Sequence, residues 1–170
     1  MSDKELREVA ATHGTVELDD LDSMRDAMGA LLALSGRTGD ILTRTLDRRL
    51  YDNDLIIDQL KRIGMVRRRA RVRVLIHDAT ALTRQSHRLW TLMRRLPTYF
   101  EVRITPRDYC NLPTAFLVAD RVASIYQPNT EIYHGMAEFY DPIRANALKR
   151  QFDQMWEPAE QSPELRTMRM

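Results

Sequence analysis

The chain has 170 residues, of which 44% are hydrophobic and 29% charged, and its net charge is +2 at pH 7. A chain of this length and composition can bury the core of a single globular domain. No stretch approaches the roughly 18 uncharged apolar residues of a membrane-spanning helix, and the acidic start MSDKELREVA resembles neither a signal peptide nor a transit peptide. We therefore expect a cytoplasmic protein without a membrane span.

The single cysteine, Cys110, excludes an internal disulfide and agrees with a reducing compartment. No base lies next to it in the sequence, so we expect an unreactive thiol rather than a nucleophile. The spacing of the four histidines matches no metal-binding motif. The sequence therefore predicts no cofactor and no metal.

Charge is distributed unevenly along the chain. Residues 1–26 hold eight acidic and three basic residues, a balance of −5, so the rest of the chain carries +7. Because a short polar stretch at the start is interrupted at His13-Gly14, we predict a flexible acidic N-terminal segment over residues 1–19. Residues 20–170 are then the single domain.

The basic residues form a run and a second set that follows it. Residues 61–73 read KRIGMVRRRARVR, with seven basic residues and no acid. Such runs attract phosphate-bearing partners through Coulomb attraction and counterion release. The alternatives are a solvated face and pairing with the acidic N-terminal segment. The candidate anion-binding residues are Arg67, Arg68, Arg69, Arg71, Arg84 and Arg88.

Hydrophobic periodicity predicts alternating helices and strands in the first half of the chain. The pattern indicates a helix over 20–34, a strand over 40–44, a helix over 53–64 and a strand over 72–76. The last of these is a short β-branched run, which is typical of a central strand covered on both faces.

The second half continues the alternation. The predicted elements are a helix over 79–96, a strand over 100–104, a hairpin turning at Asp120-Arg121, a loop over 127–140 and a helix that starts at Asp141-Pro142. The whole order predicts an α/β domain with a mixed β-sheet flanked by helices.

The hairpin carries a resemblance. The segment from Leu112 to Gln127 reads LPTAFLVADRVASIYQ. It resembles the strand–turn–strand hairpin that bears the catalytic motif HxKxxxxD of the phospholipase D superfamily. The aligned positions here are Pro113, Ala115 and Asp120, so the aspartate alone is kept. The order of elements over residues 38–157 also resembles one half of a phospholipase D fold.

The resemblance implies that the chemistry of the superfamily is lost. Its enzymes use one imidazole as a nucleophile and another as a general acid, while lysines hold the phosphoryl oxygens. Pro113 and Ala115 can do none of this. The chain therefore resembles small bacterial domains that keep the half-fold without its motif, and we expect a non-catalytic binding or scaffolding module for a phosphate-bearing or acidic partner.

Polar residues around the motif are the remaining site candidates. Asp120 lies at the turn, and Asn129 occupies about the region where the superfamily holds phosphate. His77 lies at the carboxyl end of a predicted strand, where α/β folds bind ligands, with Asp78 and His87 after it. These three residues define the alternative function, a phosphodiesterase with a relocated active site, although a histidine at a strand end more often makes a structural hydrogen bond.

Two kinds of partner are expected. Phospholipase D halves pair across the face where their motif hairpins meet, and the apolar hairpin would otherwise border an open sheet edge, so we predict a homodimer. The basic residues predict a nucleic acid or an acidic protein surface as the second kind of partner.

Overall fold

The structure is a computed structural model, and it describes residues 2–66, 70–80, 82 and 86–161. Within these residues, seven strands form one mixed sheet in the order β1-β7-β6-β5-β2-β3-β4. The strands are β1 (Thr15–Leu18), β2 (Thr38–Thr43), β3 (Arg71–Ile76), β4 (Phe100–Ile104), β5 (Ala115–Ala119), β6 (Ala123–Gln127) and β7 (Gly135–Glu138).

The direction of the strands divides the sheet into two parts. Strands β2, β3 and β4 are parallel neighbours, whereas β5, β6, β7 and β1 continue the sheet antiparallel from β2. Parallel neighbours need crossover connections, and helices α4 (Asp54–Val66) and α6 (Arg88–Arg95) lie in these connections. The carboxyl ends of β2 and β3 therefore meet at one edge of the sheet.

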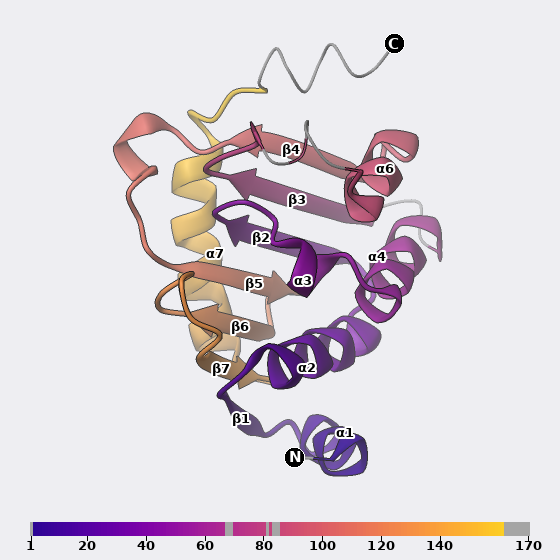
Figure 1. Cartoon of the computed structure of the whole chain (residues 1–170). Coiled ribbons are helices and arrows are strands. Elements are labelled where there is room, and N and C mark those ends of the chain that lie inside the picture. The colour runs from indigo at the N-terminus through magenta and orange to yellow at the C-terminus, as the bar shows by residue number, and fades with distance from the viewer. Residues whose placement is uncertain (1, 67–69, 81, 83–85, 162–170) are drawn as a thin grey trace.

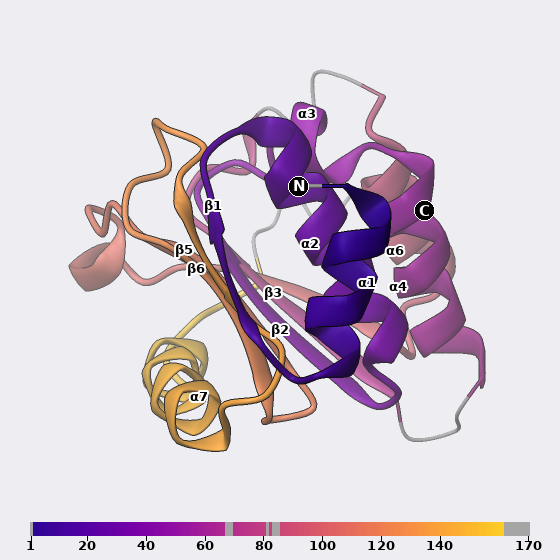
Figure 2. The ribbon, with the colours of Figure 1, turned by 90° about the horizontal axis from the view of Figure 1, so that it is seen from below.

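Helices cover the two faces of the sheet unequally. Helices α1 (Asp3–Ala11), α2 (Leu21–Leu34), α4 and α6 lie on one face, while α7 (Pro142–Trp156) lies on the other (Figures 1 and 2). Each layer has its own apolar core: Leu31 and Ile41 belong to the first, and Leu42 and Phe152 to the second. None of the helices in the described ranges is long and apolar enough to cross a membrane.

A buried ion-pair cluster joins α7 to the sheet. Arg73 of β3 donates to Asp40 of β2 at 2.6 and 2.9 Å, and to Asp153 of α7 at 2.8 Å. Its guanidinium also lies 4.9 Å from the ring centroid of Phe152. Because Asp40 is almost fully buried, its charge depends on these donors, and Lys149 is 4.0 Å away.

The expected α/β fold, a mixed sheet flanked by helices, is confirmed. The predicted helix over 20–34 is α2, which Asp20 and Ser23 start with a capping box. The final helix begins as predicted, with Asp141 as N-cap and Pro142 in the first turn. The one departure in α4 is its end, because it continues past Gly64 to Val66.

Three expectations need correction. The predicted flexible segment contains α1 and β1, and Val16 and Leu18 are buried, because β1 pairs with β7. The predicted loop over 127–140 contains β7. The hairpin of β5 and β6 borders no open edge, because β2 and β7 pair on its two sides, so this argument for a homodimer is wrong. The dimer itself stays a prediction.

The predicted helix over 79–96 is also interrupted. Helix α6 begins at Arg88, and His87 before it has extended backbone with φ −113° and ψ 115°. This conformation buries the imidazole, whose Nε2 lies 2.9 Å from the carbonyl oxygen of Leu46. His87 therefore makes a hydrogen bond to a distant part of the chain and does not continue the helix.

Candidate functional site

A polar cavity of about 330 Å³ lies at the carboxyl end of β2. The residues that line it come from distant parts of the chain: the loop after β2, the short helix α3 (Arg48–Tyr51), the first residue of β5, the last residue of β6 and the loop before β7. Ligands commonly bind at the carboxyl ends of parallel strands, where loops of different origin meet. Its lining residues include Thr43, Arg44, Asp47, Arg49, Tyr51, Ala115, Gln127 and Tyr133.

The inner wall of the cavity is neutral and fixed. Tyr51 is buried, and burial raises the pKa of its phenol, which also has a hydrogen bond with the Thr43 side chain. The Thr43 hydroxyl accepts the backbone N–H of Leu46 at 3.3 Å. Gln127 donates its amide to the carbonyl of Ile132 at 2.7 Å, which fixes the loop before β7. A neutral phenol, a hydroxyl and an amide are therefore held here.

A second group closes the outer side. The hydroxyl of Tyr133 donates to Asp47, and Arg49 lies beside both, with Nε 3.7 Å from Asp47 Oδ1 and its guanidinium 5.4 Å from the Tyr133 ring. Burial, together with the Asp47 hydrogen bond, raises the pKa of Tyr133 to about 12. The Asp47 carboxylate therefore accepts a hydrogen bond from Tyr133 and has the positive charge of Arg49 beside it.

Arg44 differs from the other arginine of the cavity. It is exposed directly after β2, and among the residues that the structure describes it makes no ion pair. Its charge also helps to lower the pKa of His77. Sequence reasoning missed Arg44, although its place at the end of a predicted strand was a signal that could have found it.

The aligned motif positions lie at both ends of β5. Ala115 lines the cavity, and the carbonyl of Pro113 accepts the N–H of Thr130 at 2.8 Å. The retained Asp120 lies beyond the opposite end of β5, where its carboxylate accepts the backbone N–H groups of residues 36, 37 and 38 at 2.7, 2.9 and 2.8 Å. The cavity therefore lies at the end of β5 where the expected alignment begins, and Asp120 holds the start of β2 by three hydrogen bonds.

The predicted pocket candidates are not brought together. His77 is half-buried and His87 is buried, and burial lowers the pKa of both imidazoles. Asp78 accepts the N–H of Thr80 at 2.9 Å in a turn. The three residues do not bring their potential ligand atoms within 4.8 Å of one another, as a metal site would require. Asn129 also has a local role, because it accepts the N–H of Glu131 at 2.9 Å.

The predicted anion-binding arginines form no described surface. Arg67, Arg68, Arg69 and Arg84 lie outside the described residues. Arg71 is exposed at the amino end of β3, the end of the parallel strands opposite to the cavity. Arg88 donates to Asp52 at 2.7 Å and to Asp54 at 2.5 Å, so its charge is already paired.

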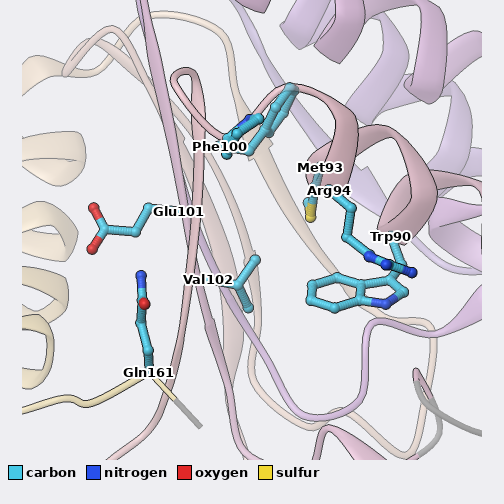
Figure 3. A pocket seen from close by; sticks show the side chains of 8 residues that line it. Trp90, Met93, Arg94, Phe100, Glu101, Val102 and Gln161 are labelled. Carbon is cyan, nitrogen blue, oxygen red and sulfur yellow. The ribbon is translucent and has the colours of Figure 1, made fainter. Parts of the chain in front are cut away.

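A second hollow lies between α6 and β4. Figure 3 shows Val102 pointing toward Trp90 and Met93, whereas Glu101 points to the other side of β4, toward Gln161. The volume of this hollow is about 40 Å³. That space holds a few waters at most, so of these two hollows the cavity at the end of β2 is the better candidate for a ligand.

Solved structures share this fold. TrmBL2, described as an archaeal chromatin protein with a novel mode of DNA binding, superposes with a TM-score of 0.64 at 13% identity over 94% of this chain and 61% of that chain. NucT from Helicobacter pylori gives 0.56 at 12% identity over 88% of this chain and 98% of its own. Nuc from Salmonella typhimurium, a phospholipase D family member, gives 0.54 at 10% identity over 81% and 91%.

These likenesses show that the fold is similar to that of phospholipase D family members. The chain spans about three fifths of TrmBL2. A search of the curated proteins found no match. A family model matches residues 20–168, and the chain therefore belongs to the family described as a domain of unknown function, DUF7931.

Proposed function

We propose that this chain is a non-catalytic binding module with a phospholipase D-like fold, and that it holds a phosphate-bearing ligand in the cavity at the end of β2. One observation carries the proposal: the fold keeps a polar cavity at the start of the motif strand, but an alanine, Ala115, lines it where the motif has its lysine. A cavity that can hold a ligand but has no reactive side chain at the motif position can bind the ligand without catalysing a reaction.

Two arginines, Arg44 and Arg49, and two acids, Asp47 and Glu131, line the cavity, so its formal charges balance, and Arg44 is the group that favours an anionic ligand. Asp47 is engaged by Tyr133 and Arg49, while Arg44 is left without an acidic partner among the described residues. A guanidinium presents a planar fork of N–H donors that suits phosphate oxygens, and the hydroxyl of Thr43 and the phenol of Tyr51 line the same space. A phosphate that contacts both arginines would replace water around Arg44 with a fixed partner.

Nucleic acid is the first phosphate-bearing ligand to test. One structural neighbour, TrmBL2, is described by its mode of DNA binding. The basic run at residues 61–73 gives a second place where a longer polyanion would find positive charge. An acidic protein surface would satisfy the same arginines, because a carboxylate matches the guanidinium fork as a phosphate does, so the likeness to TrmBL2 is what puts nucleic acid first.

The alternative of a relocated phosphodiesterase site gains no support from the geometry. His87 is buried against Leu46, and Asp78 closes a local turn. A nucleophile must reach the phosphorus and a general acid must reach the leaving oxygen bonded to it, and these side chains do not converge on one such group. We accordingly expect no hydrolysis of phosphodiester substrates, and none that depends on His77 or His87.

The test is a titration of fluorescent single-stranded and duplex oligonucleotides, at roughly 50 and 200 mM salt. We expect Arg44→Glu to weaken binding by about tenfold and to reduce the salt slope by about one. The matched control is Arg107→Glu, which makes the same charge change at an exposed position of the short helix η1 (Arg107–Tyr109). A third variant reverses Arg67, Arg68 and Arg69 together.

The variants separate three outcomes. Loss of binding in Arg44→Glu with retention in Arg107→Glu supports the cavity as the site. Equal losses in both variants would mean that net charge alone decides, and loss confined to the triple variant would move the site to the basic run. Absence of binding at low salt, or phosphodiester turnover above background, would refute the proposal.

A further inference from the structure

Three metal-ligating side chains meet at the junction of β1 and β7, where His134 directly follows Tyr133 of the cavity lining. Glu17 lies in β1, Asp19 follows it, and His134 directly precedes β7. One potential ligand atom from each side chain lies within 4.8 Å of the other two, and all three residues are exposed. Among the described parts of the chain, this is the one group of three with such spacing.

The register of the two strands explains the grouping. Glu17 is paired with Met136 and Leu18 with Gly135, so the next pair along would place Asp19 opposite His134. Side chains alternate between the two faces of a strand, and Glu17 and Asp19, two residues apart, therefore share a face. The paired backbones therefore bring the three residues together, and their exposed side chains adjust from there.

A hydrogen bond and close packing fix the backbone on both sides of these three residues. The backbone N–H of Asp19 donates to Ser23 Oγ at 3.2 Å, which ties it to the start of α2. Next to His134, Gly135 packs so tightly that a Cβ there would lie 2.3 Å from the carbonyl oxygen of Tyr126. This close approach holds the start of β7 against β6, so the strand ends are positioned before any ligand arrives.

The local charge favours a cation. In the described structure, neither Glu17 nor Asp19 pairs with a lysine or an arginine. Asp19 Oδ1 instead faces Nδ1 of His134 at 3.6 Å. Two carboxylates without a basic partner leave a negative potential at this end of the sheet, and Glu17 and Asp19 belong to residues 1–26, whose charge balance is −5.

We propose that Glu17, Asp19 and His134 bind a divalent transition-metal ion of the zinc class. Zinc accepts imidazole nitrogen and carboxylate oxygen at about 2.0–2.2 Å, so two ligands of a tetrahedral ion lie about 3.4 Å apart. The Asp19–His134 pair is already near that spacing, and rotation of the exposed Glu17 side chain supplies the third ligand. Solvent fills the fourth position.

The donor set decides between ions. Imidazole suits zinc, nickel, copper and iron, whereas magnesium and calcium prefer sites made of oxygen ligands. The bound ion would fasten β1 to β7, and so would join the segment before residue 20 to the part of the chain that the family model covers. The metal proposal does not rest on the proposed phosphate ligand, although Tyr133, the residue before His134, lines that cavity.

The experiment is calorimetric titration of the untagged, chelator-treated chain with zinc and, separately, with magnesium. The Cys110→Ser background removes the single thiol as a competing ligand. We expect one saturable zinc site and no comparable magnesium site. His134→Ala should weaken zinc binding by at least about tenfold, because it removes one of three protein ligands. Zinc should also slow amide hydrogen exchange at residues 15–18.

The matched control is His13→Ala. His13 is an exposed histidine at the other end of β1, where its ring lies 5.1 Å from that of Tyr140. Retained zinc binding in this variant, with loss in His134→Ala and in Glu17→Gln, supports the site. Absence of saturable zinc binding, equal affinity in His134→Ala, or an equal loss in His13→Ala would overturn the proposal. Circular dichroism checks that each exposed substitution leaves the fold intact.

Discussion

Replacing Asp120 tests whether the retained motif aspartate holds the fold together. Its carboxylate accepts three backbone N–H groups from residues 36–38, more than 80 positions away in the sequence. Asp120→Ala leaves these donors without a protein partner and puts alanine at a φ of 50°. Asp120→Asn keeps the Oδ1 atom, which serves residues 37 and 38, and asparagine tolerates positive φ.

The magnitude follows from how exposed each hydrogen bond is. A hydrogen bond to a charged group is worth about 1.5–3 kcal/mol, and water replaces much of it at the exposed Arg37 N–H. The bonds from Gly36 and Thr38 are partly buried, and the left-handed backbone adds about 1 kcal/mol against alanine. We expect about 3 kcal/mol of lost unfolding free energy for Asp120→Ala, and about 1 kcal/mol for Asp120→Asn.

Urea unfolding followed by circular dichroism measures both variants. The control is Asp108→Ala, an exposed aspartate of the short helix η1 (Arg107–Tyr109), which should stay within about 0.5 kcal/mol of wild type. Under folding conditions, ligand binding by the Asp120 variants should be unchanged. Wild-type stability in Asp120→Ala, or lost binding in a variant of full stability, would show that Asp120 serves the site rather than the fold.

Three more predictions follow from buried and paired groups. Arg73→Met should lower the unfolding free energy by about 3 kcal/mol, because Asp40 stays buried and Lys149 is its remaining cation. A loss below about 1 kcal/mol in urea unfolding would contradict this. Burial lowers the folded-state pKa of His77 and His87 below 6.5, so the unfolded chain takes up protons first. The unfolding free energy should therefore have its full value above about pH 6.5. As the pH falls below that value, the unfolding free energy should decrease by at most about 1.4 kcal/mol per pH unit for each histidine. Urea midpoints measured at several pH values, in wild type and in His87→Gln, check this. Light scattering tests the homodimer, which a monomer at high micromolar concentration would exclude.

The sequence by itself determined much of the local structure. Helix α2 follows from its apolar spacing and from Asp20 as a cap, and α7 from Asp141-Pro142. The hairpin of β5 and β6 follows from apolar strands around the Asp120-Arg121 turn. Pro113 and Ala115 also lead to the expectation that phospholipase D chemistry is lost, because neither side chain can act as a nucleophile or hold a phosphoryl group. Such signals are local, and residue type and spacing contain them.

Contacts between distant residues were decided by the tertiary structure. The pattern of 127–140 is too polar to predict a strand, yet β7 forms because β6 and β1 offer partners on its two sides. Helical periodicity extended through His87, but a hydrogen bond to Leu46 fixes that residue in an extended conformation. Pairing across strands and between helices depends on which surfaces meet, and a single sequence does not contain that information.

The candidate sites follow the same division. The basic run was visible in the sequence, whereas the pairing of Arg88 with Asp52 and Asp54 required the packing of α6 against the loop before α4. The cavity joins the end of β2 to Tyr133, and the proposed metal group joins Glu17 to His134 across more than a hundred residues. Chemical groups become a site when the fold sets the distances between them, because each of these interactions acts over only a few ångströms.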